Sequence, residues 1–453
     1  MTVTYDPKDP RYWEEDDLRG ELTRVYDLCH GCRMCFNLCP AFPTLFDYAD
    51  KHDGHVEKMS AAEQDHVVDE CYQCKLCYVK CPYIPPHEWN LDYPRLMMRA
   101  EAVRHKAKKD GNTMERVAKH AMSHTDLVGM LATKTSALAN KVVVQGTGKP
   151  VRKLMEKVSG ISSERILPPY AKQRFSTWFK KRTRPFLKRK QASVAVFPTC
   201  FVEYMEPAIG KDLVKVLEVN GVECDLAGTI GCCGAPMLHG GDVDAFVDGA
   251  RKMVSKLAES VRQGKDIVVP QPTCGYVLKQ DYPRYVGGPE AELVSKNTYD
   301  AAEYLMKLHK TEGKELDTEF TGDVPEEVTY HVACHLQAQN IGLKSRDLMK
   351  LTGTKITLVN KCSGIDGTWG YRAANYELAR KVAKPMGAAI EKAGNDVVTG
   401  DCHLANGAIV QETGKHPMHP IQMIARAYGI PPEDGDGTWG ASAGLTETRE
   451  TDA

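Results

Sequence analysis

CHGCRMCFNLCP at residues 29–40 and CYQCKLCYVKCP at residues 71–82 decide the fold of the N-terminal part of this chain. Each stretch spaces four cysteines as C-x2-C-x2-C-x3-C and then places a proline. Three thiolates two residues apart can wrap one corner of a polynuclear cluster, and the proline turns the chain away. Zinc ribbons use separated CxxC pairs and a thioredoxin-like motif has one CxxC in a βαβ unit, so both fit this spacing poorly.

The spacing matches that of bacterial ferredoxins with two [4Fe–4S] clusters, in which the fourth cysteine of each run binds the other cluster. We therefore expect two ferredoxin-type [4Fe–4S] clusters with crossed ligands. The first set is Cys29, Cys32, Cys35 and Cys81. The second set is Cys71, Cys74, Cys77 and Cys39.

The 31 residues between Cys39 and Cys71 are polar and helical in pattern. This predicts the all-helical ferredoxin variant rather than the compact β-rich one, as a domain over residues 1–90. Residues 91–191 then form a helical region and a basic linker.

Composition agrees with metal binding inside a cell. The chain has 453 residues, 16 cysteines and a net charge of −1. Its first residues, MTVTYDPKDPRYWEEDD, are polar and acidic, so we expect no secretory signal and a cytoplasmic protein. Thiols are kept reduced there, which favours metal ligation over disulfides. The balanced charge argues against a nucleic-acid partner, and no apolar stretch is long enough to span a bilayer.

An internal repeat fills the second half of the chain. The first copy has the strand-like segments SVAVFP, GVECDL and DIVVP, each followed by cysteine, at Cys200, at Cys232-Cys233 and at Cys274. The second copy has EVTYHVA, KITLV and NDVVTG, followed by Cys334, Cys362 and Cys402. Open α/β sheets place their sites after the carboxyl ends of strands. We therefore expect an α+β multidomain chain that ends in two pseudo-symmetric α/β lobes, at 192–320 and 321–435, and a disordered tail at 436–453.

The first lobe offers four thiolates, Cys200, Cys232, Cys233 and Cys274. Adjacent thiolates diverge, so the Cys232-Cys233 pair suits a polynuclear cluster better than one zinc ion. We expect a third iron–sulfur cluster there.

These motifs resemble one family. SHTDLVG at 123–129, CFVEY at 200–204, GCCGAP at 231–236 and HPIQMIARA at 419–427 follow the order of the iron–sulfur subunit of anaerobic glycerol-3-phosphate dehydrogenase. That family belongs to the wider class with the cysteine-rich CCG domain of heterodisulfide reductases. The resemblance implies an iron–sulfur electron-transfer subunit.

The sequence departs from the full CCG pattern of a cysteine, CCG and CxxC. In the first lobe Gln271 replaces one cysteine; the dehydrogenase family looks alike there. In the second, Ser363 and Ala405 replace two, so that only Cys334, Cys362 and Cys402 remain as possible metal ligands. We expect the second lobe to be degenerate, with Ser363 or His403 as conceivable fourth ligands.

Residues 172–190 contain nine Lys or Arg, no acid and four interleaved aromatics. This segment is a solvated linker, a contact with an anionic membrane or quinone site, or a docking surface for a partner protein. We interpret Cys224 as an ordinary buried thiol, and His416 and His419 as capping or loop residues.

The sequence has no dinucleotide or phosphate-binding fingerprint, so we expect this chain to bind no flavin or NAD. The main hypothesis is an electron-transfer component of an oxidoreductase complex, rather than its substrate-converting subunit. It would relay electrons between a flavoprotein dehydrogenase and a membrane quinone, on the inner face of the membrane. The alternative is a reductase of a disulfide or peroxide-linked acceptor that uses the first-lobe cluster. No catalytic residue can be named.

Overall fold

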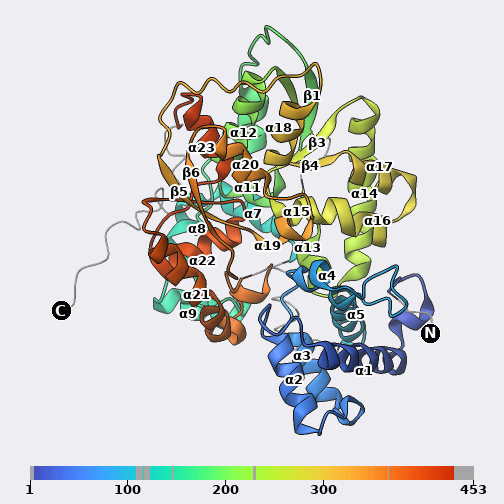
Figure 1. Cartoon of the computed structure of the whole chain (residues 1–453). Coiled ribbons are helices and arrows are strands. Elements are labelled where there is room, and N and C mark those ends of the chain that lie inside the picture. Colours follow the sequence, from blue (N-terminus) through green and yellow to red (C-terminus); the bar gives the residue numbers. More distant parts are fainter. Residues whose placement is uncertain are drawn as a thin grey trace, which may run out of the picture.

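The computed structural model of the chain describes residues 5–108, 116, 123–144, 147–227, 231–365 and 367–432. The tail expected at 436–453 lies outside these residues. Figure 1 shows a helical N-terminal part below two lobes that contain the strands.

As predicted, the described residues of the N-terminal part contain helices joined by loops and no strand. This part contains α1 Glu15–Cys32, α2 Ala41–Lys51, α3 Ala61–Asp69, α4 Leu76–Lys80 and α5 Tyr93–Lys106, with short 3-10 turns η1 Pro10–Trp13 and η2 Val56–Lys58. A capping box begins α3, because Ser60 Oγ accepts from the Glu63 N–H while the Glu63 carboxylate accepts from the Ser60 N–H.

Among the described residues, four helices connect this part to the lobes. They are α7 Thr125–Lys134, α8 Ser136–Val143, α9 Pro150–Ser159 and α10 Phe175–Lys181. The basic segment is therefore partly helical, and its Phe175 and Phe179 are buried in the core of the lobes. The preceding stretch pairs with the second lobe through a bridge between Ile161 and Arg372.

The first lobe has a four-stranded parallel sheet in the order β2-β1-β3-β4. Its elements are β1 Ala192–Val196, α11 Thr199–Tyr204, α12 Pro207–Val219, β2 Val222–Leu226, α13 Ala235–His239, α14 Val243–Arg262, β3 Asp266–Val269, α15 Pro272–Tyr276, the π-helical turn η3 Val277–Asp281, α16 Tyr282–Tyr285, α17 Gly288–Lys296, β4 Thr298–Asp300 and α18 Ala301–Lys310.

The second lobe has a three-stranded parallel sheet in the order β6-β5-β7. Its elements are β5 Glu327–His331, α19 Cys334–Ala338, α20 Lys344–Lys350, β6 Lys355–Val359, η4 Trp369–Tyr371, η5 Ala373–Asn375, α21 Tyr376–Ala393, β7 Val397–Gly400, α22 His403–Thr413 and α23 Pro420–Ala427. In both sheets the first strand along the chain lies between the second and the third, and every repeat cysteine follows a strand.

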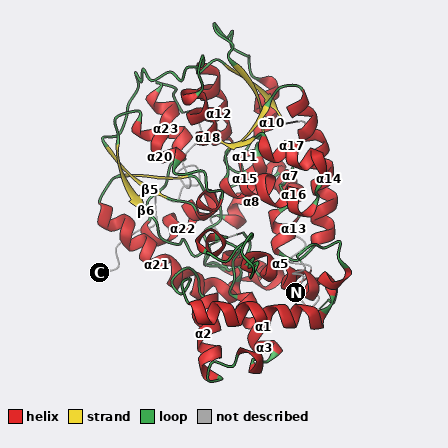
Figure 2. Cartoon of the chain, turned by 45° about the vertical axis from the view of Figure 1, so that its right-hand side comes forward, coloured by secondary structure: helices red, strands yellow, loops and turns green. Residues whose placement is uncertain are grey.

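One hydrophobic core joins the lobes. It contains Val194 and Val268 from the first sheet together with Val328 and Tyr330 from the second. Helix α23, at the end of the second lobe, packs against α12 of the first. Figure 2 shows the strands in this upper part and helices alone around the N-terminal part. The two sheets therefore share one packed body.

Candidate metal centres

The first ferredoxin set combines sulfurs from both runs. Cys29 and Cys32 lie in the last turn of α1, Cys35 follows it, and Cys81 ends α4. Cys29 lies close enough to Cys35, Cys81 and Cys32 for their charges to act on it, and burial and these neighbours raise its pKa. Burial, followed by Cys81 and Cys32, raises the pKa of Cys35 to about 11. The fourth sulfur near the first run thus comes from the second.

The second set surrounds a cavity. Cys39, Cys71, Cys74 and Cys77 line a small cavity of about 10 Å³, together with apolar side chains such as Phe42. Burial, and then Cys74 and Cys71, raise the pKa of the Cys39 thiol. Here the first run supplies one sulfur to the second.

The loops that carry these cysteines bend through left-handed backbone. Arg33 and Lys75 occupy the same position in the two runs and have φ angles of 53° and 65°. Their environments differ, because the Arg33 side chain is 43% exposed whereas Lys75 is only 2% exposed. Lys75 Nζ donates to Gln73 Oε1 at 2.6 Å beside the cavity. One set therefore has a buried amine next to it and the other an exposed guanidinium.

These residues fit iron–sulfur clusters. Within the described ranges, no three His, Cys, Asp or Glu side chains are grouped closely enough to hold a single metal ion. Thiolates around a cluster stand further apart than ligands on one ion, and the all-sulfur sets are those that clusters take. Buried thiols with raised pKa values resist ionisation, so a cationic metal core is needed to stabilise them as thiolates.

The first lobe brings its four cysteines together after three strands. Cys200 follows β1, Cys232 and Cys233 follow β2, and Cys274 lies in α15 after β3. Hydrogen bonds from the Cys200 and Cys233 thiols lower the pKa of Cys232. The bond to Cys232 raises the pKa of Cys233, and so does a further bond with Cys274. These hydrogen bonds make Cys232 easier to ionise than Cys200 and Cys233, whose pKa values are raised.

Helix α7 covers the four cysteines of the first lobe. This contact was not predicted from the sequence. Asp126 Oδ2 accepts a hydrogen bond from the Cys232 N–H at 2.7 Å, and burial raises the pKa of Asp126 to about 6. A Cβ at Gly129 would lie 2.5 Å from the Tyr204 ring, so α7 needs glycine to approach α11 this closely. The SHTDLVG motif carries both residues, but a contact across 106 positions has no local signal.

The second lobe turns two cysteines towards the N-terminal part. Cys334 and Cys362 pack against an apolar cluster that contains Tyr72 and Cys74. Tyr72 Oη and Cys362 Sγ form a hydrogen bond of 3.1 Å. The Trp369 ring lies 5.1 Å from that of Tyr72, and its Nε1 donates to the Asp69 carbonyl at 2.7 Å. Trp369 belongs to the GTWGY motif at 367–371, whereas Tyr72 was not singled out from the sequence.

The substituted positions of the second lobe have other partners. Cys402 packs with Ala333 and Ala405 in a small apolar cluster. Ser363 Oγ donates to the Ile365 carbonyl at 3.3 Å. His403 Nδ1 bonds Gln271 Oε1 at 2.7 Å.

Gln271 and His403 therefore join the two lobes. Gln271 stands where the full pattern has a cysteine, and it is 1% exposed. The His403 ring also stacks on Phe201 of the first lobe, with 3.8 Å between the ring centres. Burial lowers the pKa of His403 to about 3, so the ring is neutral at physiological pH.

Two smaller predictions are confirmed. Cys224 is buried in β2, where its thiol lies 3.6 Å from the Val222 carbonyl. His419 caps α23, since its Nδ1 accepts from the Ile421 N–H at 3.2 Å.

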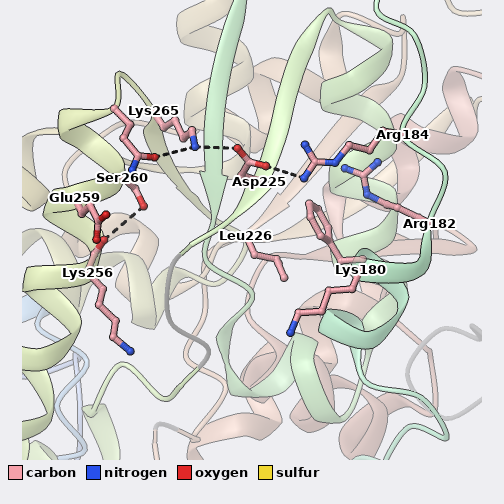
Figure 3. A pocket seen from close by; sticks show the side chains of 11 residues that line it. Lys180, Arg182, Arg184, Asp225, Leu226, Lys256, Glu259, Ser260 and Lys265 are labelled. Atoms are coloured by element: carbon pink, nitrogen blue, oxygen red, sulfur yellow. Dashed lines mark hydrogen bonds and ion pairs between the residues drawn. The ribbon is translucent and has the colours of Figure 1, made fainter.

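The basic segment contributes to a pocket of about 600 Å³ (Figure 3). Several of its charges are already paired there. Arg182 bonds Glu218 at 2.8 Å, and Arg184 bonds Asp225 at 2.8 Å. Throughout the described part of the chain, no helix has the length and apolar character required to cross a membrane.

Comparisons with known proteins match both halves of the chain. Residues 22–109 match the Fer4-like domain of citrate utilization protein B, and residues 194–279 and 328–405 match the cysteine-rich CCG domain. The chain is 30% identical to a subunit of the anaerobic glycerol-3-phosphate dehydrogenase of Escherichia coli K12, over 72% of this chain and 80% of that protein.

Two further relatives share shorter regions. One subunit of the fumarate reductase (CoM/CoB) of Methanothermobacter marburgensis is 29% identical over 51% of this chain and 44% of its own length. Lactate utilization protein A of Bacillus cereus AH187 is 25% identical over 51% of this chain and 98% of its own length. This chain, an iron–sulfur protein with a ferredoxin-like domain and two cysteine-rich domains, therefore belongs to the family of the iron–sulfur subunit of anaerobic glycerol-3-phosphate dehydrogenase.

Proposed function

We propose that this chain is the electron-transfer subunit of an oxidoreductase complex, relaying electrons between a flavoprotein dehydrogenase and a membrane quinone. Its cofactors are two [4Fe–4S] clusters on the crossed ferredoxin sets and a third iron–sulfur cluster on the four cysteines of the first lobe. When bound, such clusters supply one-electron transfer at potentials set by their surroundings.

One chain of hydrogen bonds carries this proposal. Gln73, next to Cys74, accepts at its carbonyl from His335 Nε2 at 2.9 Å. His335 Nδ1 accepts from Thr273 Oγ1 at 2.8 Å, and Thr273 is the neighbour of Cys274. The second ferredoxin set is thereby joined through one imidazole to the first-lobe cysteines. The second ferredoxin set also contacts the second lobe, through the hydrogen bond between Tyr72 and Cys362.

The remaining residues hold these groups in place. Gln339 Nε2 donates to the Pro272 carbonyl at 3.0 Å and fixes α15 beside α19. Asp126 orients the Cys232 loop. We assign residues 1–90, 91–191, 192–320 and 321–435 to the ferredoxin domain, the connecting region and the two lobes. We place the protein in the cytoplasm, on the inner face of the membrane.

Co-purification tests the proposal. The chain, tagged at its C-terminus and isolated anaerobically from its native host, should co-elute with a flavoprotein whose substrate bleaches the cluster absorbance. His335→Leu should slow cluster reoxidation by a water-soluble quinone but leave the iron content unchanged. A lone chain that reduces a disulfide without any flavoprotein would refute the relay and support the alternative reductase.

A further inference from the structure

Exposed apolar side chains gather on three consecutive helices. Of the fourteen large apolar side chains exposed in the described residues, seven belong to α7, α8 and α9. We call them the apolar face: Leu127, Val128, Leu131, Leu138, Val151, Leu154 and Val158. Leu138 is 68% exposed and Leu154 is 64% exposed. Apolar patches of this kind mark surfaces that contact a partner or a membrane.

These helices expose apolar side chains and bury a charged one, the reverse of ordinary surface helices. On α9 the exposed Val151, Leu154 and Val158 recur at spacings of three and four residues, whereas Arg152 is fully buried. Surface helices of globular proteins turn the apolar stripe inward instead. Helix α8 contacts both α7 and α9, so the exposed side chains belong to neighbouring helices (Figure 1).

The exposed charges on and next to the same helices are all positive. The exposed charged residues among the described part of 123–160 are five lysines, Lys134, Lys141, Lys149, Lys153 and Lys157. The acids Asp126 and Glu156 are half-buried, and each accepts from a backbone N–H, of Cys232 and Ser163 respectively. Leucine and valine interleaved with lysine are the composition of helices that lie in an anionic lipid interface.

The basic segment at 172–190 has fewer exposed apolar side chains with which to contact a membrane, and several of its charges are already paired. Its Phe175 and Phe179 are buried, and Phe186, at 92% exposure, is its one fully projecting aromatic side chain. Arg189 and Lys190 pair with Glu315 and Glu223 at 2.6 and 2.7 Å.

We propose that the apolar face docks on an anionic lipid surface, with its leucines and valines in the acyl boundary and its lysines at the headgroups. Helix α7 carries Leu127 and Leu131 on its exposed side, while Asp126 at its start holds the Cys232 loop. Docking therefore brings lipid to within one helix of the first-lobe cysteines. The inference rests on the proposed function in one respect: a quinone dissolved in this lipid would lie close to the first-lobe cysteines.

Vesicle flotation of the full-length protein, purified with its clusters, tests this surface. The protein should float with vesicles of phosphatidylcholine and phosphatidylglycerol, less with phosphatidylcholine alone, and less at raised salt. The double variant Leu131→Glu/Leu154→Glu should partition at least about tenfold more weakly. The matched controls Phe186→Glu and Val219→Glu, at exposed apolar positions elsewhere, should float like the unmodified protein.

A second double variant tests the same surface without replacing apolar side chains, so that misfolding is not the cause of a lost interaction. Lys153→Glu/Lys157→Glu changes exposed charges alone and should also reduce flotation, with unchanged cluster absorbance. The proposal would be overturned if both double variants floated as well as the unmodified protein, or if the unmodified protein did not float. Capture of another polypeptide on this face without lipid binding would overturn it too. Cluster reoxidation by a water-soluble quinone, measured without vesicles, tests the electron relay separately.

Discussion

Lys75 and Arg33 occupy equivalent positions in the two ferredoxin runs, yet only the lysine is buried. A positive charge stabilises the reduced, more negative form of a neighbouring cluster. We expect Lys75→Met to lower the midpoint potential of the Cys71/Cys74/Cys77 cluster. For unit charges roughly 8 Å apart at an effective dielectric of ~20, such an effect is on the order of 2 kcal/mol, or roughly 90 mV for one electron.

Redox titration followed by electron paramagnetic resonance measures this shift. Arg33→Met is the matched control, because the exposed guanidinium is screened by water and should change its own cluster far less. Equal shifts in both variants would contradict the role of burial.

The crossed sulfurs make a second prediction at this scale. Cys39→Ser should damage the cluster held mainly by the second run, and Cys81→Ser the cluster held mainly by the first. The reason is that each sulfur lies among the cysteines of the other run. Spectra of the two variants distinguish the clusters, and damage confined to each variant's own run would show that the ligands are not crossed.

Motif spacing alone predicts the crossed ligand sets, because each run repeats the same ferredoxin pattern. It could not predict the Gln271–His403 bond or the Tyr72–Cys362 contact, which join positions 132 and 290 residues apart. Such contacts depend on how the lobes pack, and their residue types are unremarkable in the sequence.

Arg152 holds the end of α8, the start of α9 and the following loop together. It is fully buried and donates to the carbonyls of Val143, Ser162 and Arg165 at 2.5, 2.8 and 3.0 Å. Arg152→Ala should destabilise this region by roughly 2–4 kcal/mol, since it removes a buried side chain that donates to three carbonyls. Denaturant unfolding and proteolysis within 144–165 measure the loss. Lys153→Ala, at the exposed neighbouring position, should remain close to the unmodified protein.

The sequence pattern predicted the positions of most strands in the two lobes. All six predicted segments contain strands, since each is a short run rich in β-branched residues, including the largely exposed edge strand β6. The seventh, β4, is only Thr298–Asp300 and has too few residues for a pattern. The basic segment was read as a linker, a membrane contact or a docking surface. Part of it forms α10 and buries two aromatics, because the core of the lobes accepts them, and that packing has no signal in the segment itself.

At the scale of the whole molecule the two lobes should differ in metal content. Anaerobically purified protein should hold about eight iron on the ferredoxin sets and about four more on the first lobe. Cys233→Ala should remove the latter and stop electron throughput, whereas Cys362→Ala should cost less iron. The reason is that the second lobe retains three thiolates, with Ser363 and Ala405 at the substituted positions. Iron analysis and electron-transfer activity of the two variants show which lobe holds the third cluster.

Loss of four iron from Cys362→Ala alone would show that the cluster belongs to the second lobe instead.

The core shared by the lobes also sets an order of events during synthesis. Helix α12 ends at Val219 and its partner α23 begins at Pro420. At ~5–20 residues per second, the ribosome needs roughly 10–40 s to make the intervening chain. Throughout that interval the nascent first lobe keeps its α12 surface uncovered, whereas the ferredoxin cysteines have long emerged. Iron delivery to the N-terminal sets can therefore begin on the ribosome, while packing of the second lobe on α12 waits for α23, the last helix among the described residues.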